Sequence, residues 1–458
     1  MSARYFSKYF GVIEILKCKI SRKDAKRKYR DQYNDQKYKA FVSILKEELI
    51  PAMGCTEPIA IAYCASLVKD YLNNKPQIID IYVSGNILKN VKSVTVPNTQ
   101  GMHGIDVACA IGIIAGISEK KLEVISCVSN DQIKQLHEYL KNTNISIKHS
   151  NNDSVLYIEI IGKYDNDVVK VVIKDAHTNV TLIEKNNVII FKKNEEVEVK
   201  NYKTDKSVLS IKEIIEFTDL VNIEDVKETL DRQIKYNMAI AKEGLKNNYG
   251  ANIGKTILKY SNNDIVQYAK ALAAAGSDAR MNGCDMPVVI NSGSGNQGIT
   301  ASVPLIAYKE AYNLSDEKLY RALVLSNLCA IHIKNSIGKL SAFCGVVIAG
   351  AGSGAGIAYL NDGKEEEICH AIVNALGIIS GVVCDGAKSS CAAKIASSVE
   401  AGFLGYFMFK EGNQFLGGEG IIKKGIENTI KAIGQLARVG MCETDKEIIS
   451  LMLDDNQN

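Results

Sequence analysis

The chain has 458 residues, 46% of them apolar, which is enough for two domains and a large core. Its net charge of +3 is uneven: residues 1–38 hold 11 basic and 4 acidic residues, whereas the remainder holds 44 and 48. The body of the chain therefore has no bias toward nucleic acid. No apolar run is long and unbroken enough to span a bilayer, and twelve cysteines without a secretory signal favour a reducing, cytoplasmic compartment.

Residues 1–38 contain the basic cluster SRKDAKRKYR at 21–30. Such a cluster is compatible with a targeting extension or a nucleic-acid-binding arm. The segment also contains acidic residues and lacks a clean amphipathic period. We therefore expect a solvated, disordered extension.

The first helical pattern spans residues 38–50, with apolar side chains at helical spacing. The sequence GCTEP follows at 54–58, and Pro58 suits the first turn of a second helix over 59–72. Cys55 then lies at or just before a helix N-terminus, where the helix dipole and free N–H groups favour the thiolate. Cys55 is a candidate base or nucleophile, and an inert cysteine in a capping turn is the alternative.

Residues 77–205 alternate between short apolar runs and turns rich in Asn, Asp and Gly. The candidate strands are IIDIYVS, KSVTV, LEVISCV, VLYIEII, VVKVVI, VTLIE and NVIIF. Two stretches, 107–117 and 131–140, suit helices. This region is predicted to be an inserted α/β lobe. Within it, His177 lies between strands, and we favour a turn residue over a catalytic one.

After a charged bridge at 201–235, the chain is rich in Ala and Gly and helical to its end. The segment NSGSGNQG at 291–298 lies between a strand-like PVVI and a helix-like run. Its glycines and small polar side chains bring N–H donors and amide groups to one concave spot, which indicates carboxylate or phosphate binding. A loop of ordinary turn-forming residues is the alternative.

Cys384 and Cys391 lie seven residues apart in a run of small residues, a spacing that returns to the same face of a helix. A third thiol, Cys344, also lies among glycines and alanines. Three thiolates can hold three irons of a [4Fe-4S] cluster and leave the fourth open to act as a Lewis acid. Burial of cysteine as a small apolar side chain is the alternative, and we expect Cys329 to pack in this way.

Together, GCTEP, NSGSGNQG, HIKNSIGKLSAFCG and CDGAKSSCAAKIASS resemble the L-cysteine desulfidases, a bacterial and archaeal family related to the α-domain of iron-sulfur L-serine dehydratases. The resemblance covers about residues 40–445. It implies that Cys55 is the catalytic base and that the cluster ligands are Cys344, Cys384 and Cys391. The related serine dehydratases carry a histidine-containing SHT motif where this chain has Cys55 and Thr56, which weakens the case for a serine substrate.

The implied reaction is an α,β-elimination of L-cysteine to pyruvate, sulfide and ammonia, an activity of amino-acid catabolism. The substrate thiolate ligates the open iron of the [4Fe-4S] cluster, and Cys55 removes the Cα proton. We expect the substrate carboxylate to be held by the glycine-rich loop and by lysines. The residues concerned are Ser292, Ser294, Asn296, Lys339 and Lys388.

The predicted fold is α+β: a mostly helical catalytic domain resembling the serine dehydratase α-domain, with an inserted α/β lobe. We expect an extension over 1–38, a helical part of the catalytic domain over 39–75, the lobe over 76–205 and the iron-sulfur domain over 206–458. A small amino acid is the expected partner, with no nucleic acid and no membrane. The sequence leaves the oligomeric state open, and a homo-oligomer is one option.

Three other functions compete with this one. An iron-sulfur L-serine ammonia-lyase would use the same site. A lyase dependent on pyridoxal phosphate would need a Schiff-base lysine, for which Lys339 is the one tempting candidate. A non-catalytic iron-sulfur sensor would need neither Cys55 nor a carboxylate-binding loop.

Overall fold

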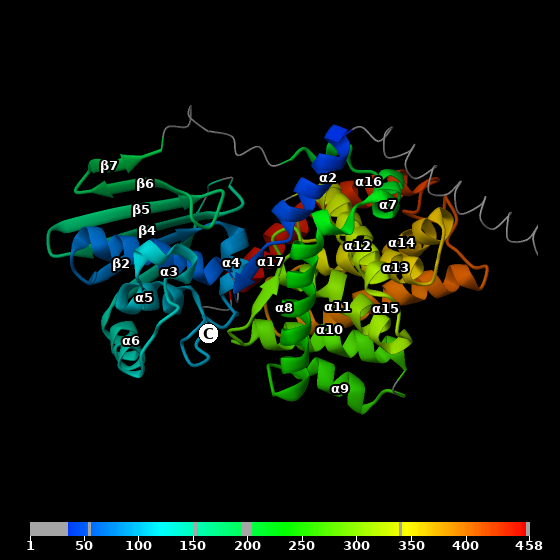
Figure 1. Cartoon of the computed structure of the whole chain (residues 1–458). Helices are drawn as coiled ribbons and strands as arrows, with labels where there is room; N and C mark the ends of the chain where they lie inside the picture. Colours follow the sequence, from blue (N-terminus) through cyan, green and yellow to red (C-terminus); the bar gives the residue numbers. More distant parts are fainter. Residues whose placement is uncertain are drawn as a thin grey trace, which may run out of the picture.

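The computed structural model describes residues 35–53, 56–150, 152, 154–193, 204–262, 264–338 and 341–454. It confirms the predicted α+β class: a helical domain and a smaller lobe with a six-stranded sheet lie next to each other (Figure 1). Each part has its own cluster of buried apolar side chains. In the part of the chain that the structure describes, no helix has the length and apolar character needed to cross a membrane.

The α/β lobe comprises residues 56–193. Its helices are α3 (Thr56–Leu72), α4 (Gly85–Val91), α5 (Ile105–Ala115), the 3₁₀ helix η1 (Ser118–Glu123) and α6 (Asn130–Asn142). Its strands are β2 (Ile78–Val83), β3 (Asn144–His149), β4 (Tyr157–Tyr164), β5 (Asp167–Lys174), β6 (Val180–Lys185) and β7 (Val188–Lys192). They pair in the order β3-β2-β4-β5-β6-β7, and β2 with β3 is the parallel pair among them. Alternate residues of β4 are buried on the face covered by α3, as expected of a sheet covered on one face (Figure 1).

Two predicted strands in the lobe are wrong, and one strand was missed. KSVTV, at 92–96, forms turns after α4, and LEVISCV, at 122–128, continues from η1 into turns. Their apolar residues Val96, Val124 and Ile125 are buried in the lobe core. These segments are apolar because they fill the core, and they do not pair as strands. The missed strand is β3, whose mostly exposed side chains give little apolar signal.

The helical domain comprises residues 35–53 and 204–454. Before the cysteine-bearing segments it contains α2 (Asp35–Glu48), η3 (Lys206–Val208), α7 (Ile211–Leu220), η4 (Ile223–Asp225), α8 (Lys227–Lys246), α9 (Ile253–Lys259) and α10 (Ile265–Met281). It continues with α11 (Gly295–Tyr312), α12 (Asp316–Ile337), α13 (Gly345–Leu360), α14 (Glu365–Ile379), α15 (Cys391–Lys410), α16 (Ile426–Gln435), the π-helical turn η5 (Leu436–Gly440) and α17 (Cys442–Asp454). Two short strands, β1 (Pro51–Met53) and β8 (Pro287–Val289), pair antiparallel.

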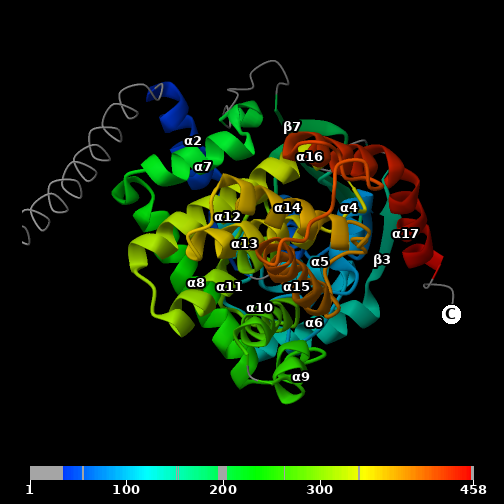
Figure 2. The same cartoon turned by 90° about the vertical axis from the view of Figure 1, so that its right-hand side faces the viewer.

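Helix α13 is the central helix of this domain, surrounded by α11, α12, α14 and α15 (Figure 2). Glycines allow the close approach of these helices. A Cβ at Gly350 would lie 2.3 Å from the carbonyl oxygen of Ser398, and one at Gly354 would lie 2.7 Å from that of Gly402. The Gly/Ala-rich sequence after Cys344 therefore serves backbone-to-backbone packing of α13 on α15.

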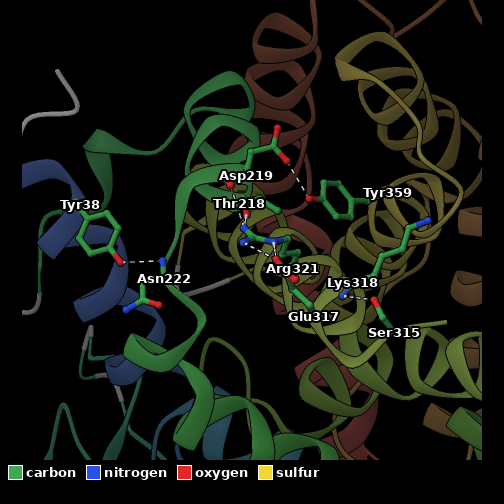
Figure 3. Close-up of polar contacts among 9 residues, drawn as sticks. All are labelled: Tyr38, Thr218, Asp219, Asn222, Ser315, Glu317, Lys318, Arg321 and Tyr359. Carbon is green, nitrogen blue, oxygen red and sulfur yellow. Dashed lines mark hydrogen bonds and ion pairs between the residues drawn. The ribbon is translucent and has the colours of Figure 1, made fainter. Parts of the chain in front are cut away.

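Polar contacts attach α7 to α12 and α13 on the outside of the domain (Figure 3). The Arg321 guanidinium of α12 donates to the carbonyl oxygen of Asp219 at 3.0 Å. The Tyr359 hydroxyl of α13 donates to the Asp219 carboxylate at 2.9 Å. The Tyr38 hydroxyl of α2 accepts the N–H of Asn222 at 3.1 Å. The contact of Tyr38 thus holds α2 on the helical domain, although the lobe follows α2 in the sequence.

The boundary between the two parts differs from the predicted one. We expected residues 39–75 in the catalytic domain, but α3 packs against α5, β4 and β5 of the lobe. Its apolar side chains occupy most faces of the helix, so the sequence alone gives no preferred partner. Strand β1 of the helical domain ends at Met53, and α3 of the lobe begins at Thr56. Of the predicted extension over 1–38, residues 1–34 lie outside the described residues. Residues 35–38 belong to α2.

Candidate functional site

Cys344, Cys384 and Cys391 lie on three segments that meet at one end of the helical domain. Cys344 is the N-cap of α13, Cys384 lies in the connection between α14 and α15, and Cys391 is the first residue of α15. The N–H of Cys344 donates to the carbonyl oxygen of Val382 at 3.0 Å, and the N–H of Cys384 donates to that of Ala342 at 2.5 Å. We call the group of three cysteines the cysteine site.

The predicted reason for the spacing of Cys384 and Cys391 is wrong. They do not lie two turns apart on one helix, because residues 381–390 are not helical and α15 begins at Cys391. Gly386, with φ +93°, turns the chain back on itself between them. The Cys391 thiol donates to the Gly386 carbonyl oxygen at 3.5 Å. The two cysteines are neighbours through this turn.

Cys384 is the thiol of this site that is most readily ionised. A hydrogen bond from the Cys344 thiol lowers the pKa of Cys384 to about 6; burial opposes this, while the Gly386 N–H and the positive charges of Lys89 and Lys394 add to it. The same hydrogen bond, together with burial, raises the pKa of Cys344 well above its ordinary value. The lowered pKa favours the thiolate form of Cys384 over that of Cys344.

Cationic side chains surround the cysteine site. Burial lowers the pKa of Lys334, whereas the charges of Cys384 and Cys344 act in the opposite direction. Burial also acts against the charged form of Lys394, but its pKa is raised because Asp385 accepts a hydrogen bond from it and pairs with its charge. These cations offset the negative charge that several thiolates would place in a buried site.

The predicted substrate-binding Lys388 lies in the turn between Cys384 and Cys391. It forms an ion pair with Asp385, and its Nζ also donates to the Asp385 carbonyl oxygen at 2.9 Å. Burial opposes ionisation of Asp385, yet the hydrogen bonds from Lys388 and Lys394 lower its pKa. Lys388 thus orders the turn, and its contact with substrate stays a prediction. Lys339, the other predicted charge partner, lies outside the described residues.

The glycine-rich loop joins β8 to α11, as its sequence predicted. Asn291 and Ser294 exchange two backbone hydrogen bonds of 3.0 Å around Ser292 and Gly293, whose φ values are +50° and +84°. This is the geometry of a tight turn that requires two left-handed residues. The Ser294 hydroxyl then caps α11 by accepting the N–H of Gln297 at 3.4 Å. The turn therefore fixes where α11 begins.

A buried amide network holds the start of this loop. The side chain of Asn291 donates to the Asn327 carboxamide oxygen at 2.9 Å, and Asn327 donates to Gln233 at 2.8 Å. All three residues are fully buried. Ser292 donates to the Asn291 carboxamide oxygen at 3.0 Å. The loop is thus tied to α8 and α12, and for Ser292 and Ser294 a role in substrate binding stays a prediction.

Gln297 brings the glycine-rich loop against the cysteine site. A Cβ at Gly345 would lie 2.5 Å from Gln297 Nε2, so the carboxamide rests on the residue that follows Cys344. Gln297 is 5% exposed, and its Oε1 has no hydrogen-bond partner among the described residues. A buried, unsatisfied carboxamide oxygen beside the cysteines is a group available to a ligand.

Arg280 forms a second link between the loop and the cysteine site, and sequence reasoning missed it. Its guanidinium donates to the Asn296 carboxamide oxygen at 3.3 Å, and a Cβ at Gly295 would lie 2.3 Å from its Nε. Its positive charge also favours the thiolate of Cys391, although burial is the larger effect and raises the pKa of that thiol. A signal was present, because Arg280 is a buried cation near the end of the apolar helix α10.

The segment that contains Cys55 is anchored on both sides, while Cys55 itself lies outside the described residues. Met53 of β1 pairs with Pro287 of β8. On the other side, α3 begins at Thr56, three residues before the predicted start, with Pro58 in its first turn as expected. The Glu57 carboxylate accepts a hydrogen bond from Asn90 of α4 at 3.2 Å. Helix α4 also carries Lys89, whose charge acts on Cys384. The short helix α4 therefore contacts both Glu57, near the start of α3, and the turn of the cysteine site at Gly386.

The residues of the cysteine site fit an iron-sulfur cluster better than a single ion. Within the described ranges, no group of three or more His, Cys, Asp or Glu side chains can share one metal ion. A [4Fe-4S] cluster differs in that each thiolate binds its own iron. The donor set fits it: three thiols from three segments, one with a lowered pKa, are surrounded by cations.

His177 and Cys329, which the sequence analysis also considered, occupy the positions expected of structural residues. His177 lies in the turn between β5 and β6, as predicted. Cys329 is fully buried within α12 and belongs to the core of the helical domain, as expected of a packing residue. Burial raises the pKa of its thiol well above the ordinary value.

Comparisons with known proteins identify the family of this chain. The family described as serine dehydratase alpha chain matches residues 119–450. The UPF0597 protein of Desulfitobacterium hafniense is 56% identical over 420 residues, which cover 92% of this chain and 98% of that protein. UPF0597 proteins of Treponema denticola and Lachnoclostridium phytofermentans are 45% and 47% identical over 92% and 91% of this chain, and over 99% and 100% of their own lengths. The chain therefore belongs to the serine dehydratase alpha chain family.

Proposed function

We propose that the protein is an iron-sulfur-dependent lyase that converts L-cysteine to pyruvate, sulfide and ammonia. The observation that carries this proposal is the meeting of three cysteines, one favoured as a thiolate, beside the N-terminus of α11. Membership of a family associated with iron-sulfur serine dehydratases supports the same reaction class. We place the reaction in the cytoplasm, with a small amino acid as the partner.

Three residues, Cys344, Cys384 and Cys391, would hold a [4Fe-4S] cluster and leave one iron without a protein ligand. When bound, such a cluster supplies a Lewis acid that attracts the electron pair of a leaving group. The protein contributes the surrounding charge, since Lys334 and Lys394 offset the thiolates. Cys344 is buried, whereas Cys384 and Cys391 are half-buried, so the site is accessible to a substrate from that side.

The substrate carboxylate would bind where the glycine-rich loop meets the cysteines. The free N–H groups at the start of α11 and the guanidinium of Arg280 are suited to an anion. The carboxamides of Asn296 and Gln297 line the same place, and the Gln297 Oε1 can accept a hydrogen bond from the substrate ammonium group.

Proton removal is assigned to Cys55. Its Sγ, as a thiolate before the N-terminus of α3, accepts the proton from the substrate Cα. The electrons of the Cα–H bond form a Cα=Cβ double bond, and the Cβ–S bond breaks so that sulfur leaves with its electron pair. The 2-aminoacrylate product tautomerises to an imine, which takes up water to give pyruvate and ammonia.

L-serine is the second candidate substrate, favoured by the description of the family as a serine dehydratase alpha chain. The elimination would be the same, with hydroxide as the leaving group in place of sulfide. Cys55 in the place of a histidine-containing motif favours L-cysteine. The two substrates are distinguished by turnover.

The test is an anaerobic assay of protein reconstituted with iron and sulfide, with L-cysteine and L-serine offered separately. We expect pyruvate, ammonia and sulfide in equal amounts from L-cysteine, and much slower release of pyruvate from L-serine. Faster turnover of L-serine would assign the second function. The absence of pyruvate from both substrates would reject the lyase.

Two controls separate the competing cofactors and roles. Cys329→Ala should retain both iron and activity, because that thiol packs in the core, whereas Cys384→Ala should lose both. A visible band that is removed by hydroxylamine would indicate pyridoxal phosphate in place of a cluster. If the protein binds a cluster through the three cysteines but converts neither L-cysteine nor L-serine, the result would support a non-catalytic iron-sulfur sensor.

A further inference from the structure

The α/β lobe reaches the cysteine site through helix α4. A Cβ at Gly386 would lie 1.9 Å from the carbonyl oxygen of Lys89, so the backbone of α4 touches the turn between Cys384 and Cys391. The φ of +93° at Gly386 also requires glycine. This contact joins the last turn of a lobe helix to the segment that carries two of the three cysteines.

The side chain of Lys89 is buried between the two parts of the protein. Lys89 is 3% exposed, and its Nζ forms an ion pair with the carboxylate of Asp445 on α17. Its positive charge favours the thiolate of Cys384. The backbone of Lys89 therefore contacts Gly386, two residues after Cys384, while its side chain pairs with Asp445 of the C-terminal helix.

Helix α17 holds α4 in this position. Figure 1 shows the two helices side by side between the lobe and the helical domain. The Lys92 Nζ donates to the carbonyl oxygen of Met452, and a Cβ at Gly85 would lie 2.3 Å from the Ile449 side chain. The contacts at Gly85 and Lys92 fix α4 at both ends, which leaves Lys89 with little freedom to move.

We propose that Lys89 is a positioning residue of the cysteine site, through which the α/β lobe supplies a buried positive charge beside Cys384. This inference rests on the proposed function in one respect, the role of Cys384 as a cluster ligand. A buried group of thiolates is costly unless cations compensate it. Lys334 and Lys394 come from the helical domain itself, whereas Lys89 comes from the lobe, so the site is incomplete without the lobe.

The experiment compares four variants of the full chain, reconstituted anaerobically with iron and sulfide. Lys89→Met keeps the length of the side chain and removes its charge, and Lys89→Arg keeps the charge. Asp445→Asn removes the partner carboxylate. The matched control is Lys134→Met, because Lys134 is an exposed lysine of the lobe helix α6 that pairs with Asp131 and takes no part in holding α4. The readouts are the midpoint potential of the cluster and the rate at which a chelator removes iron.

We expect Lys89→Met to shift the midpoint potential to a more negative value and to lose iron several-fold faster than the wild type. Asp445→Asn should shift the potential in the opposite direction, since it removes a negative charge and leaves Lys89 less shielded. Lys89→Arg should retain the wild-type potential, and Lys134→Met should leave it unchanged. Lys89→Met and Asp445→Asn would shift the midpoint potential and the rate of iron loss in the same direction if Lys89 served only to pair with Asp445. That result would overturn the proposal.

A second measurement separates this inference from the proposed function. In the iron-free chain, hydrogen exchange of residues 381–390 should be faster in Lys89→Met than in the wild type, and unchanged in Lys134→Met. If the wild type binds no iron but this difference is found, the proposed function fails and the positioning role stands. If Lys89→Met matches the wild type in exchange, potential and iron retention, the positioning role is rejected.

Discussion

Substitution of Gly386 by alanine should break the contact between the lobe and the cysteine site. Alanine at φ +93° costs about 1–2 kcal/mol, because the Cβ crowds the backbone in the left-handed region. The new Cβ would also lie 1.9 Å from the Lys89 carbonyl oxygen, which is backbone and cannot rotate away. Relief of such a clash by shifts of packed elements costs about a further 1–3 kcal/mol. We expect Gly386→Ala to destabilise the protein by about 2–5 kcal/mol.

Gly412→Ala is the matched control for this prediction. Gly412 has a φ of +79°, and a Cβ there would have no neighbour within 4 Å, so only the backbone strain of about 1–2 kcal/mol applies. The assay is urea unfolding of both variants, followed by far-ultraviolet circular dichroism, with limited proteolysis to report separation of the lobe. An equal loss of stability in the two variants would refute the contact between α4 and the cysteine-bearing turn.

Three further predictions concern the cysteines. Cys344→Ala, Cys384→Ala and Cys391→Ala should each reduce bound iron and acid-labile sulfide together, whereas Cys329→Ala should not; full iron content in any of the first three removes that residue from the ligand set. Cys55→Ser should retain the cluster and lose turnover by orders of magnitude, because a serine hydroxyl is a far weaker base at neutral pH; loss of iron would instead make Cys55 a ligand. In the iron-free protein, alkylation of Cys384 by iodoacetamide should have a midpoint near pH 6 and slow below it as the thiolate is protonated. Peptide mass spectrometry measures this profile, and a midpoint near the ordinary thiol value of 9.0 would contradict the lowered pKa.

The local features of the site follow from sequence because they depend on near neighbours in the chain. Pro58 indicates the first turn of α3, and NSGSGNQG indicates a turn followed by a helix N-terminus. The structure confirms both. It also confirms that PVVI contains a strand, although the partner strand β1 was not predicted. A three-residue strand carries too little periodicity to be recognised.

Contacts between distant segments are what the sequence does not reveal. Helix α3 is apolar on most faces, so its assignment to the lobe depends on the sheet that forms after it. Lys89 and Asp445 are two ordinary charged residues until α4 and α17 meet. The spacing of Cys384 and Cys391 indicated proximity, but for a helical reason that Gly386 excludes. For this pair, the spacing in the sequence predicted that the two cysteines are close, but it did not predict the backbone conformation between them.

The most direct measurement is Mössbauer spectroscopy of protein reconstituted with ⁵⁷Fe, recorded with and without L-cysteine under anaerobic conditions. If Cys344, Cys384 and Cys391 hold a [4Fe-4S] cluster with one open iron, L-cysteine should change the isomer shift of one iron in four and leave the other three unchanged. A spectrum in which the substrate changes no iron, or in which all four irons already show thiolate ligation without it, would contradict the account.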